Sequence, residues 1–301
     1  MSDVEIIEAI RLSHPILLDT PAGVLSIIAH YGRPNVYTFS GREKITITTY
    51  HYPAVKTIYT KRSLAWLTVI RDIVGSVGDT IYLRGYDDSN VVLFSFNMST
   101  HTFTYLTRIG LCLSLCISPT RCVYVHRGYG LVSYPLDSIP PVGKEIPSTI
   151  LTRTESESFF SRGSVYIIGG TDHNYQKVDD CTRYDTNENK WHPVASLPVP
   201  SRVLSMTEKD GSLVVITTTA DVFIHNMDKN AWSKAEWDKD FMKLSSLLLR
   251  YSNGKFYAVS EANKRNPVNI VWESSSPEEP WEPILEIPQA TSAVHIHLNT
   301  E

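Results

Sequence analysis

One stretch of this sequence decides the fold: SVYIIGG at residues 164–170, followed by RYD at 183–185, NKW at 189–191 and LPVPSR at 197–202. The first segment is a run of β-branched and aromatic residues ending in two glycines, which is typical of a strand that leads into a tight turn. The tyrosine and the tryptophan of the next two segments supply large side chains that fill the space between packed sheets. The stretch therefore predicts a unit of several strands.

The same pattern returns along the chain with a nearly constant period. Each copy has an aromatic or aliphatic pair after a turn, and the pairs begin at Val36, Ile81, Val123, Val165, Leu213 and Phe256, with spacings of 45, 42, 42, 48 and 43 residues. A period in the forties with several strands per unit is typical of propeller blades, and alternation at period two excludes a helical solenoid. We therefore predict an all-β, six-bladed propeller with four-stranded antiparallel blades.

The unit at residues 164–202 resembles the kelch motif, in which a double glycine follows one strand, Tyr-Asp lies on the next strand, and a tryptophan comes about six residues later. Here Trp191 follows Tyr184 by seven residues. Weaker copies lack the double glycine; they begin at Val91, Asp221 and Asn269. The resemblance implies a kelch-like propeller similar to that of kelch-like adaptor proteins, without their N-terminal dimerising domain.

The predicted ring has a surplus strand. A short apolar run, suited to the innermost strand of a blade, precedes each pair, at residues 24–31, 64–74, 111–118, 157–162, 203–208 and 244–251. A seventh run lies at 292–298, and propellers often close when one terminus completes the blade begun by the other. We expect 292–298 to pair with the first blade near 35–59. The predicted domains are an extension at 1–22, with a short helix capped by Ser2 and Glu5, and a propeller at 23–301.

Composition narrows the classes of partner and compartment. Lys and Arg number 28 against 32 Asp and Glu, with a net charge of −4 and interspersed signs, so no basic stripe is available for nucleic acid. The sequence has neither a signal peptide pattern nor an apolar run near the roughly 18 residues of a membrane helix. Four cysteines fit a reducing compartment. We predict a cytoplasmic protein without nucleic-acid or membrane partners.

Motifs for catalysis and metal binding are missing from the sequence. There is no G-x-S-x-G elbow, no P-loop and no G-x-G-x-x-G that opens a helix. Cys112, Cys116 and Cys122 lack the paired spacing of a zinc site and are interpreted as core thiols. We predict no catalytic residues, no metal and no cofactor.

Candidate binding residues lie mainly in the loops that join the second and third strands of each blade, because rigid scaffolds present binding residues on loops. The loop at 169–180 is the longest of these, with twelve residues. Arg202 follows Leu-Pro-Val-Pro at the turn into an inner strand. It could form a salt bridge with a neighbouring blade, or it could point into the channel mouth and bind an acidic peptide. The predicted set is Arg42, Tyr86, Asp87, Arg127, Tyr129, His173, Tyr175, Arg202, Lys264 and Arg265.

The favoured function is a noncatalytic module that binds a protein or peptide on one propeller face. The family resemblance implies substrate recognition or competition in ubiquitin-ligase or cytoskeletal pathways. One alternative is an enzyme that acts on a small polar ligand such as a sugar in the central channel, for which the polar candidates are His30, Arg71, Glu157 and His295. A purely structural module of a larger complex is the third reading, and it would expose a broad apolar patch.

Overall fold

The computed structural model describes residues 24–30, 33–40, 46–51, 54–59, 69–87, 90–97, 99–100, 102–110, 112–127, 130–137, 140–148, 153–237, 247–252, 254–260 and 268–288. These residues form β-strands and their connections, without a helix. Accordingly, this part of the chain has no helical span of the length and apolarity that crossing a membrane requires. The helix predicted within 1–22 and the strand predicted at 292–298 lie outside the described residues.

The strands occupy four positions, from the innermost to the outermost edge of each sheet. The innermost strands are β1 (Val24–His30), β5 (Val69–Val77), β9 (Ser114–Ile117), β13 (Glu157–Ser161), β17 (Val203–Lys209) and β21 (Leu247–Ser252). The second strands are β2 (Arg33–Ser40), β6 (Thr80–Asp87), β10 (Cys122–His126), β14 (Ser164–Ile168), β18 (Ser212–Thr217) and β22 (Lys255–Ser260). The third strands are β3 (Thr46–His51), β7 (Asn90–Asn97), β11 (Gly130–Pro135), β15 (Cys181–Asp185), β19 (Val222–Asn226) and β23 (Val268–Ser274). The outermost strands are β4 (Ala54–Tyr59), β8 (Thr102–Arg108), β12 (Lys144–Pro147), β16 (Lys190–Val194), β20 (Ala231–Ala235) and β24 (Glu282–Pro288).

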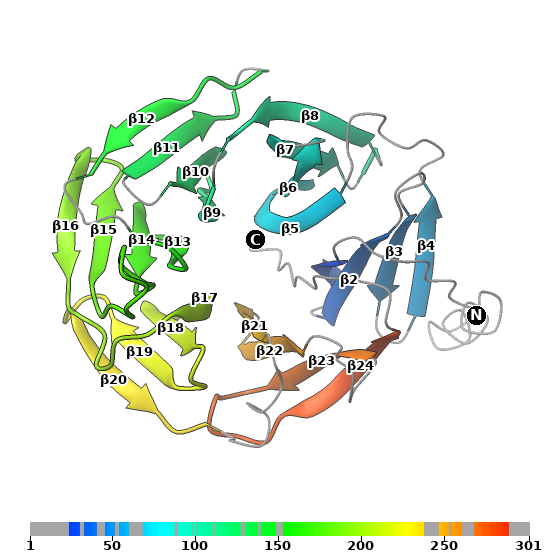
Figure 1. Cartoon of the computed structure of the whole chain (residues 1–301). Coiled ribbons are helices and arrows are strands. Elements are labelled where there is room, and N and C mark those ends of the chain that lie inside the picture. The colour runs from blue at the N-terminus through cyan, green and yellow to red at the C-terminus, as the bar shows by residue number, and fades with distance from the viewer. Residues whose placement is uncertain are drawn as a thin grey trace.

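Each sheet contains four consecutive strands paired antiparallel, and the sheets stand around a ring (Figure 1). Adjacent innermost strands contact one another in the order β1, β5, β9, β13, β17 and β21. The predicted all-β propeller with four-stranded antiparallel blades is therefore confirmed. Of the six predicted blades, five have described side-chain packing, and the sheet β1–β4 is described by its backbone alone.

The antiparallel order gives the ring two different faces. Connections from a second to a third strand, and from an outermost strand to the next blade, emerge on one face, which we call the loop face. Turns from the first to the second strand and from the third to the fourth emerge on the opposite face, which we call the turn face. The predicted binding loops, including 169–180, therefore belong to the loop face.

Strand β14 shows why its sequence is apolar without alternation. All five of its residues are buried. Val165 and Ile167 join a cluster with residues of β9–β11, whereas Tyr166 and Ile168 join a cluster with residues of β17–β19. A radial sheet packs against a neighbour on both faces, so both side-chain rows of its second strand must be apolar.

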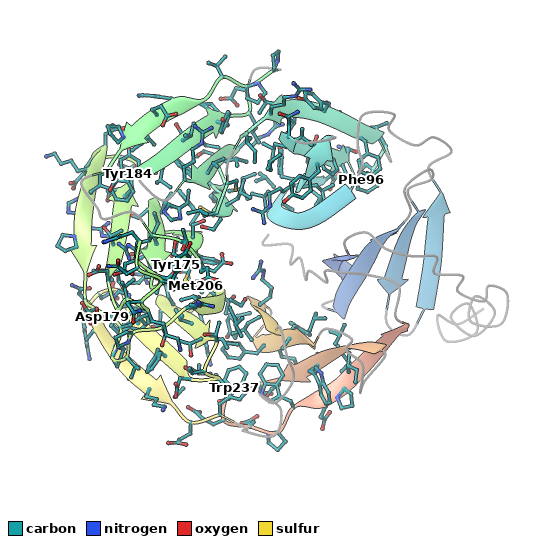
Figure 2. All side chains as sticks on the ribbon, viewed as in Figure 1. Phe96, Tyr175, Asp179, Tyr184, Met206 and Trp237 are labelled. Carbon is teal, nitrogen blue, oxygen red and sulfur yellow. The ribbon has the colours of Figure 1, made fainter. Side chains whose placement is uncertain are left out.

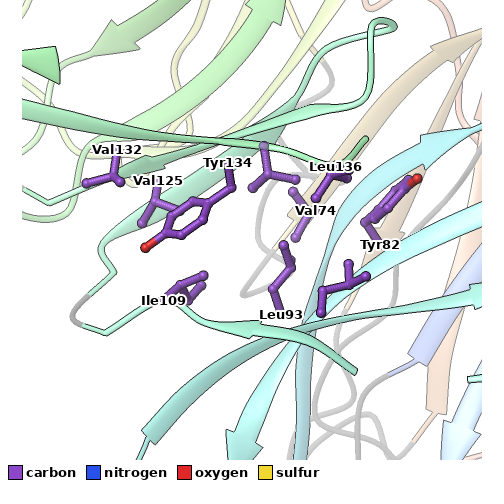
Figure 3. Close-up of a cluster of buried hydrophobic side chains, with 10 residues drawn as sticks. Val74, Tyr82, Leu93, Ile109, Val125, Val132, Tyr134 and Leu136 are labelled. Atoms are coloured by element: carbon purple, nitrogen blue, oxygen red, sulfur yellow. The ribbon is translucent and has the colours of Figure 1, made fainter. Parts of the chain in front are cut away.

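The same division holds along the rest of the described ring. On β18, Leu213 and Val215 pack toward β14, while Val214 and Ile216 pack toward β22. The cluster between the blades β5–β8 and β9–β12 contains Tyr82, Leu93 and Tyr134 (Figure 3). Burial of each such side chain stabilises the fold by about 1.5–3 kcal/mol, so the contacts between blades carry much of the stability.

The innermost strands β17 and β21 are joined by side chains instead of a continuous ladder. The backbone N–H of Leu249 donates to Ser205 Oγ and that of Tyr251 donates to Thr207 Oγ1, each at 2.9 Å. An innermost strand has no further strand on its inner edge, so its backbone donors need such acceptors. Ser205 and Thr207 therefore satisfy the edge of the next blade.

Candidate functional site

The connection between β14 and β15, residues 169–180, forms a small hairpin on the loop face, which we call the Tyr175 hairpin. Its limbs pair through a bridge between Thr171 and Lys177. At its tip, the N–H of Asp172 donates to the carbonyl oxygen of Gln176 at 2.9 Å, and the N–H of Tyr175 donates to that of Asp172 at 3.0 Å. A loop with this many internal backbone hydrogen bonds holds its tip in a defined position.

Asp172 organises the tip of this hairpin with its side chain. Its Oδ1 accepts the backbone N–H groups of Asn174, at 2.8 Å, and of Gln176, at 2.9 Å. These hydrogen bonds, above all the one from Gln176, lower the pKa of Asp172 below its ordinary value. The side chain is therefore a carboxylate at neutral pH and keeps the compact turn that short polar residues favour.

Tyr175 is the most exposed large hydrophobic side chain of the described residues, with 79% of its surface accessible. Its φ of 59° lies in the left-handed region, which is costly for a side chain with a Cβ. The hairpin hydrogen bonds hold it there despite this strain. An exposed aromatic ring on a rigid support is a favourable anchor for a partner because little conformational entropy remains to be lost.

Two glycines at the base of the hairpin allow it to sit between the flanking connections. Gly169 has φ 55° and Gly170 has φ 107°. A Cβ on Gly169 would lie 2.4 Å from the carbonyl oxygen of Ser201, and one on Gly170 would lie 2.5 Å from that of Thr154. The double glycine of the sequence motif is thus required both by backbone conformation and by close packing.

The flanking connections also hydrogen-bond to the return limb of the hairpin. The N–H of Leu197 donates to the carbonyl oxygen of Asp179 at 2.8 Å, and that of Ser201 donates to Val178 at 3.1 Å. From the other side, Arg153 Nη1 donates to the carbonyl oxygen of Asp180 at 2.5 Å. The hairpin is therefore fixed by the connections that enter and leave its blade, and Tyr175 and Asp179 lie on the β13–β20 side of the ring (Figure 2).

Arg127, a predicted binding residue, is held by contacts within the protein. Its Nη1 lies 3.0 Å from Glu145 Oε1, and its Nη2 donates to the carbonyl oxygen of Ile109 at 2.8 Å and to Tyr134 Oη at 3.1 Å. These contacts tie β12 and the connection after β8 to the end of β10. The guanidinium thereby joins two blades on the loop face.

Arg202 is paired across a blade boundary. Its Nε lies 2.7 Å from Oε2 of Glu155, which belongs to the connection before β13. Of the two placements that the sequence left open for Arg202, the structure shows a salt bridge to a residue of the adjacent connection. The same carboxylate oxygen accepts the hydroxyl of Thr171 at 3.2 Å, so the ion pair also contacts the base of the Tyr175 hairpin.

The other predicted residues are distributed unevenly. Tyr86 lies within β6 rather than in the loop after it, and it is half-buried. His173 is exposed in the Tyr175 hairpin, where its Nε2 is 3.1 Å from Asn174 Nδ2. Asp87 ends β6, and its side chain lies outside the described part. The positions not described are those of Arg42, Tyr129, Lys264 and Arg265.

A buried polar group beneath the loop face was not predicted from the sequence. His126 and Ser156 are each 3% exposed, and His126 Nδ1 lies 3.2 Å from Ser156 Oγ. Burial, and to a smaller extent the charge of Arg153, lowers the pKa of His126 from 6.5 to about 4. Arg153 itself is 2% exposed. The ring of His126 is thus neutral at physiological pH, and the pair links β10 to the connection before β13.

Among the inner-strand polar residues named for a sugar-binding channel, Glu157 is the one whose side chain the structure describes. Its charge acts on Arg250 of β21, whose pKa is lowered to about 10 chiefly by burial. Arg250 Nη1 also donates to the carbonyl oxygen of Leu249 at 2.8 Å and of Met206 at 3.3 Å. Arg250 therefore helps to join the innermost strands β17 and β21.

On the turn face, Asp185, Glu188 and His192 place potential metal-ligand atoms within 4.8 Å of one another. Both oxygens of Asp185 already accept hydrogen bonds: Oδ1 from the N–H of Asn187 at 3.0 Å, and Oδ2 from Arg183 Nη1 at 3.0 Å. A neighbouring guanidinium opposes cation binding because of charge repulsion. The cluster is therefore described best as a hydrogen-bonded turn between β15 and β16.

Comparison with known proteins agrees with the fold. The kelch motif matches residues 153–198, which include the Tyr175 hairpin and its flanking connections. No curated protein matches the sequence. A solved structure described as a nidogen/laminin complex is similar, with TM-score 0.59 and 11% identity, over 87% of this chain and 97% of that chain.

A second similar structure is the SapL1 lectin in complex with alpha methyl fucoside, with TM-score 0.59 and 10% identity, over 90% of this chain and 97% of that chain. At such low identity these two likenesses concern the fold alone. The kelch motif matched at 153–198, set in a ring of four-stranded antiparallel blades, supports a kelch-repeat β-propeller.

Proposed function

We propose that this propeller is a noncatalytic interaction module that binds a protein or peptide segment on its loop face, with Tyr175 as an anchor. The observation that carries the proposal is the 79% exposure of Tyr175 at the tip of a hairpin fixed by the connections that enter and leave its blade. Exposed aromatic residues in rigid positions contribute a large share of binding energy at interfaces. The kelch motif supports a role of this kind.

The surroundings of Tyr175 add apolar surface to the same region. Val199, 48% exposed, belongs to the connection that hydrogen-bonds to the return limb of the hairpin. The strained φ of Tyr175 is a cost that the fold bears at this position, and such strain is concentrated at binding and catalytic sites. The family resemblance favours a cytoplasmic adaptor role, as substrate recognition or competition in a ubiquitin-ligase or cytoskeletal pathway.

The direct test uses photocrosslinking in the native cell. A photoreactive phenylalanine analogue at position 175 is expected to form adducts with a partner protein. The matched control places the same analogue at Val142, which is 77% exposed but lies between β11 and β12 on the turn face. Adducts that form equally from both positions, or from neither, would contradict the proposal.

A substitution separates anchoring from mere proximity. Affinity purification then measures how much of the partner identified by crosslinking is recovered. Tyr175→Ala should reduce this recovery by about tenfold or more, since truncation of an interface anchor costs about 2 kcal/mol or more. Val142→Ala should leave recovery unchanged. Unchanged recovery with Tyr175→Ala would show that this ring is near the partner without holding it.

A further inference from the structure

On the loop face around the Tyr175 hairpin, the arginines are paired or buried, whereas most carboxylates of the hairpin have no described ion pair. Arg127 is paired with Glu145 and Arg202 with Glu155, while Arg153 is 2% exposed beneath the hairpin. These three arginines therefore have little charge to offer an incoming ligand. The sequence left open that Arg202 binds an acidic peptide. Such a peptide would have to displace the carboxylate of Glu155, which lies 2.7 Å from Arg202 Nε.

The Tyr175 hairpin itself carries three carboxylates against one lysine. Asp172 lies on the outgoing limb next to the tip, and Asp179 and Asp180 lie on the return limb. No ion pair of Asp179 is described, and the charge of Asp180 acts on the buried Arg153. Asp172 uses Oδ1 for the turn, and no ion pair of its carboxylate is described. The hairpin's single lysine, Lys177, is exposed.

An exposed tyrosine ring with carboxylates on both limbs of its supporting hairpin matches the chemistry of an arginine side chain. A guanidinium stacks on aromatic faces and donates hydrogen bonds to carboxylates along its edge. Val199 adds apolar surface in the neighbouring connection. We infer that the segment bound at Tyr175 is basic, with arginine side chains that stack on this ring or pair with the carboxylates of Asp172 and Asp179.

This inference rests on the proposed loop-face binding and specifies the chemistry of the partner. It is tested by selecting displayed random twelve-residue peptides on the full chain at low ionic strength. Sequences with an arginine beside an apolar residue should be enriched. Their binding should weaken as salt rises, because exposed ion pairs are screened.

Two matched variants assign the effect to the hairpin. Asp172→Asn combined with Asp179→Asn keeps the hydrogen-bond acceptor of the turn while removing both charges, and it should raise the Kd of the selected peptides by about fivefold. Asp137→Asn removes an exposed carboxylate from the turn face and should leave the Kd unchanged. Circular dichroism and thermal melting check that the variants remain folded.

The outcomes separate this inference from the proposed function. Three results would overturn the inference that the bound segment is basic. These are enrichment of acidic or uncharged peptides, no enrichment at all, and equal binding of the selected peptides by the wild type and the double variant. If acidic or uncharged peptides are enriched but bind the Tyr175→Ala variant less tightly than the wild type, the proposed binding on the loop face stands. If the selected peptides are indifferent to Tyr175→Ala, the proposed function fails as well.

Discussion

Arg202 and Glu155 form an ion pair across the boundary between two blades, with Nε of Arg202 2.7 Å from Oε2 of Glu155. Glu155 precedes β13 and Arg202 precedes β17, so the pair joins two connections that flank the Tyr175 hairpin. The side chains are 39% and 47% exposed. The pair is therefore well placed to set the geometry of the loop face but is accessible to solvent and salt.

A double-mutant cycle should find a small contribution of this pair to stability. Arg202→Ala, Glu155→Ala and the double variant are expected to give a coupling free energy below about 1 kcal/mol, because exposed ion pairs gain little in water. Urea denaturation measures each free energy of unfolding. The coupling should shrink further in about 1 M salt. A coupling well above 2 kcal/mol, insensitive to salt, would mean that the pair is effectively buried.

Gly170→Ala should be far more destabilising than an alanine at another glycine of similar backbone conformation. The added Cβ would lie 2.5 Å from the carbonyl oxygen of Thr154 and 2.9 Å from the N–H nitrogen of Ser156. With a φ of 107° in addition, we expect a loss of about 3 kcal/mol or more in the free energy of unfolding. Urea denaturation is the measurement.

Gly254→Ala is the matched control for that substitution. Its φ is 77°, but a Cβ there would meet no atom within 4 Å. The loss should be limited to about 1 kcal/mol of backbone strain. Similar losses at Gly170 and Gly254 would show that the close approach of the flanking connection is relieved by a small backbone shift.

Stability should fall as the pH drops from about 6.5 to about 4, in part because of His126. Its pKa is lowered to about 4 in the folded protein, so within this range the unfolded chain binds the proton more strongly. Protonation therefore favours unfolding, and the contribution lost by pH 4 is about 3 kcal/mol. Urea denaturation at pH 4.5 and at pH 7 measures the change.

The variant His126→Asn isolates this contribution from those of the acidic residues. It should be less stable than the wild type at pH 7, because it loses buried ring contacts, but it should lose less stability on acidification. A pH dependence identical to that of the wild type would show that His126 is protonated without cost in the folded state.

The sequence predicted the propeller because its main determinants are local and repeated. The runs at 157–162 and 203–208 became β13 and β17, since apolar segments between turn residues form strands whatever their neighbours. The double glycine at 169–170 also marked the unit that matches the kelch motif. Its physical reason, the approach of Thr154 and Ser201, depends on chain segments that only the assembled blades bring together.

The charge balance of the loop face could not be predicted in the same way. Arg127 was expected to face a ligand, yet its partner Glu145 lies 18 residues away and is brought close by the pairing of β11 with β12. The burial of His126 similarly depends on packing against the connection before β13. Tyr175 was identified by loop length and residue type, whereas its backbone strain and exposure required the structure.

The construction of each blade from four consecutive strands has a consequence for how the protein is made. Ladder hydrogen bonds within a blade join segments close in sequence, whereas the link from Ser205 to Leu249 spans 44 residues. We therefore expect a blade of the described ring to form soon after its strands leave the ribosome and to dock on the preceding blade as the next one emerges. During synthesis, the apolar side of the newest blade is the surface that a chaperone would meet.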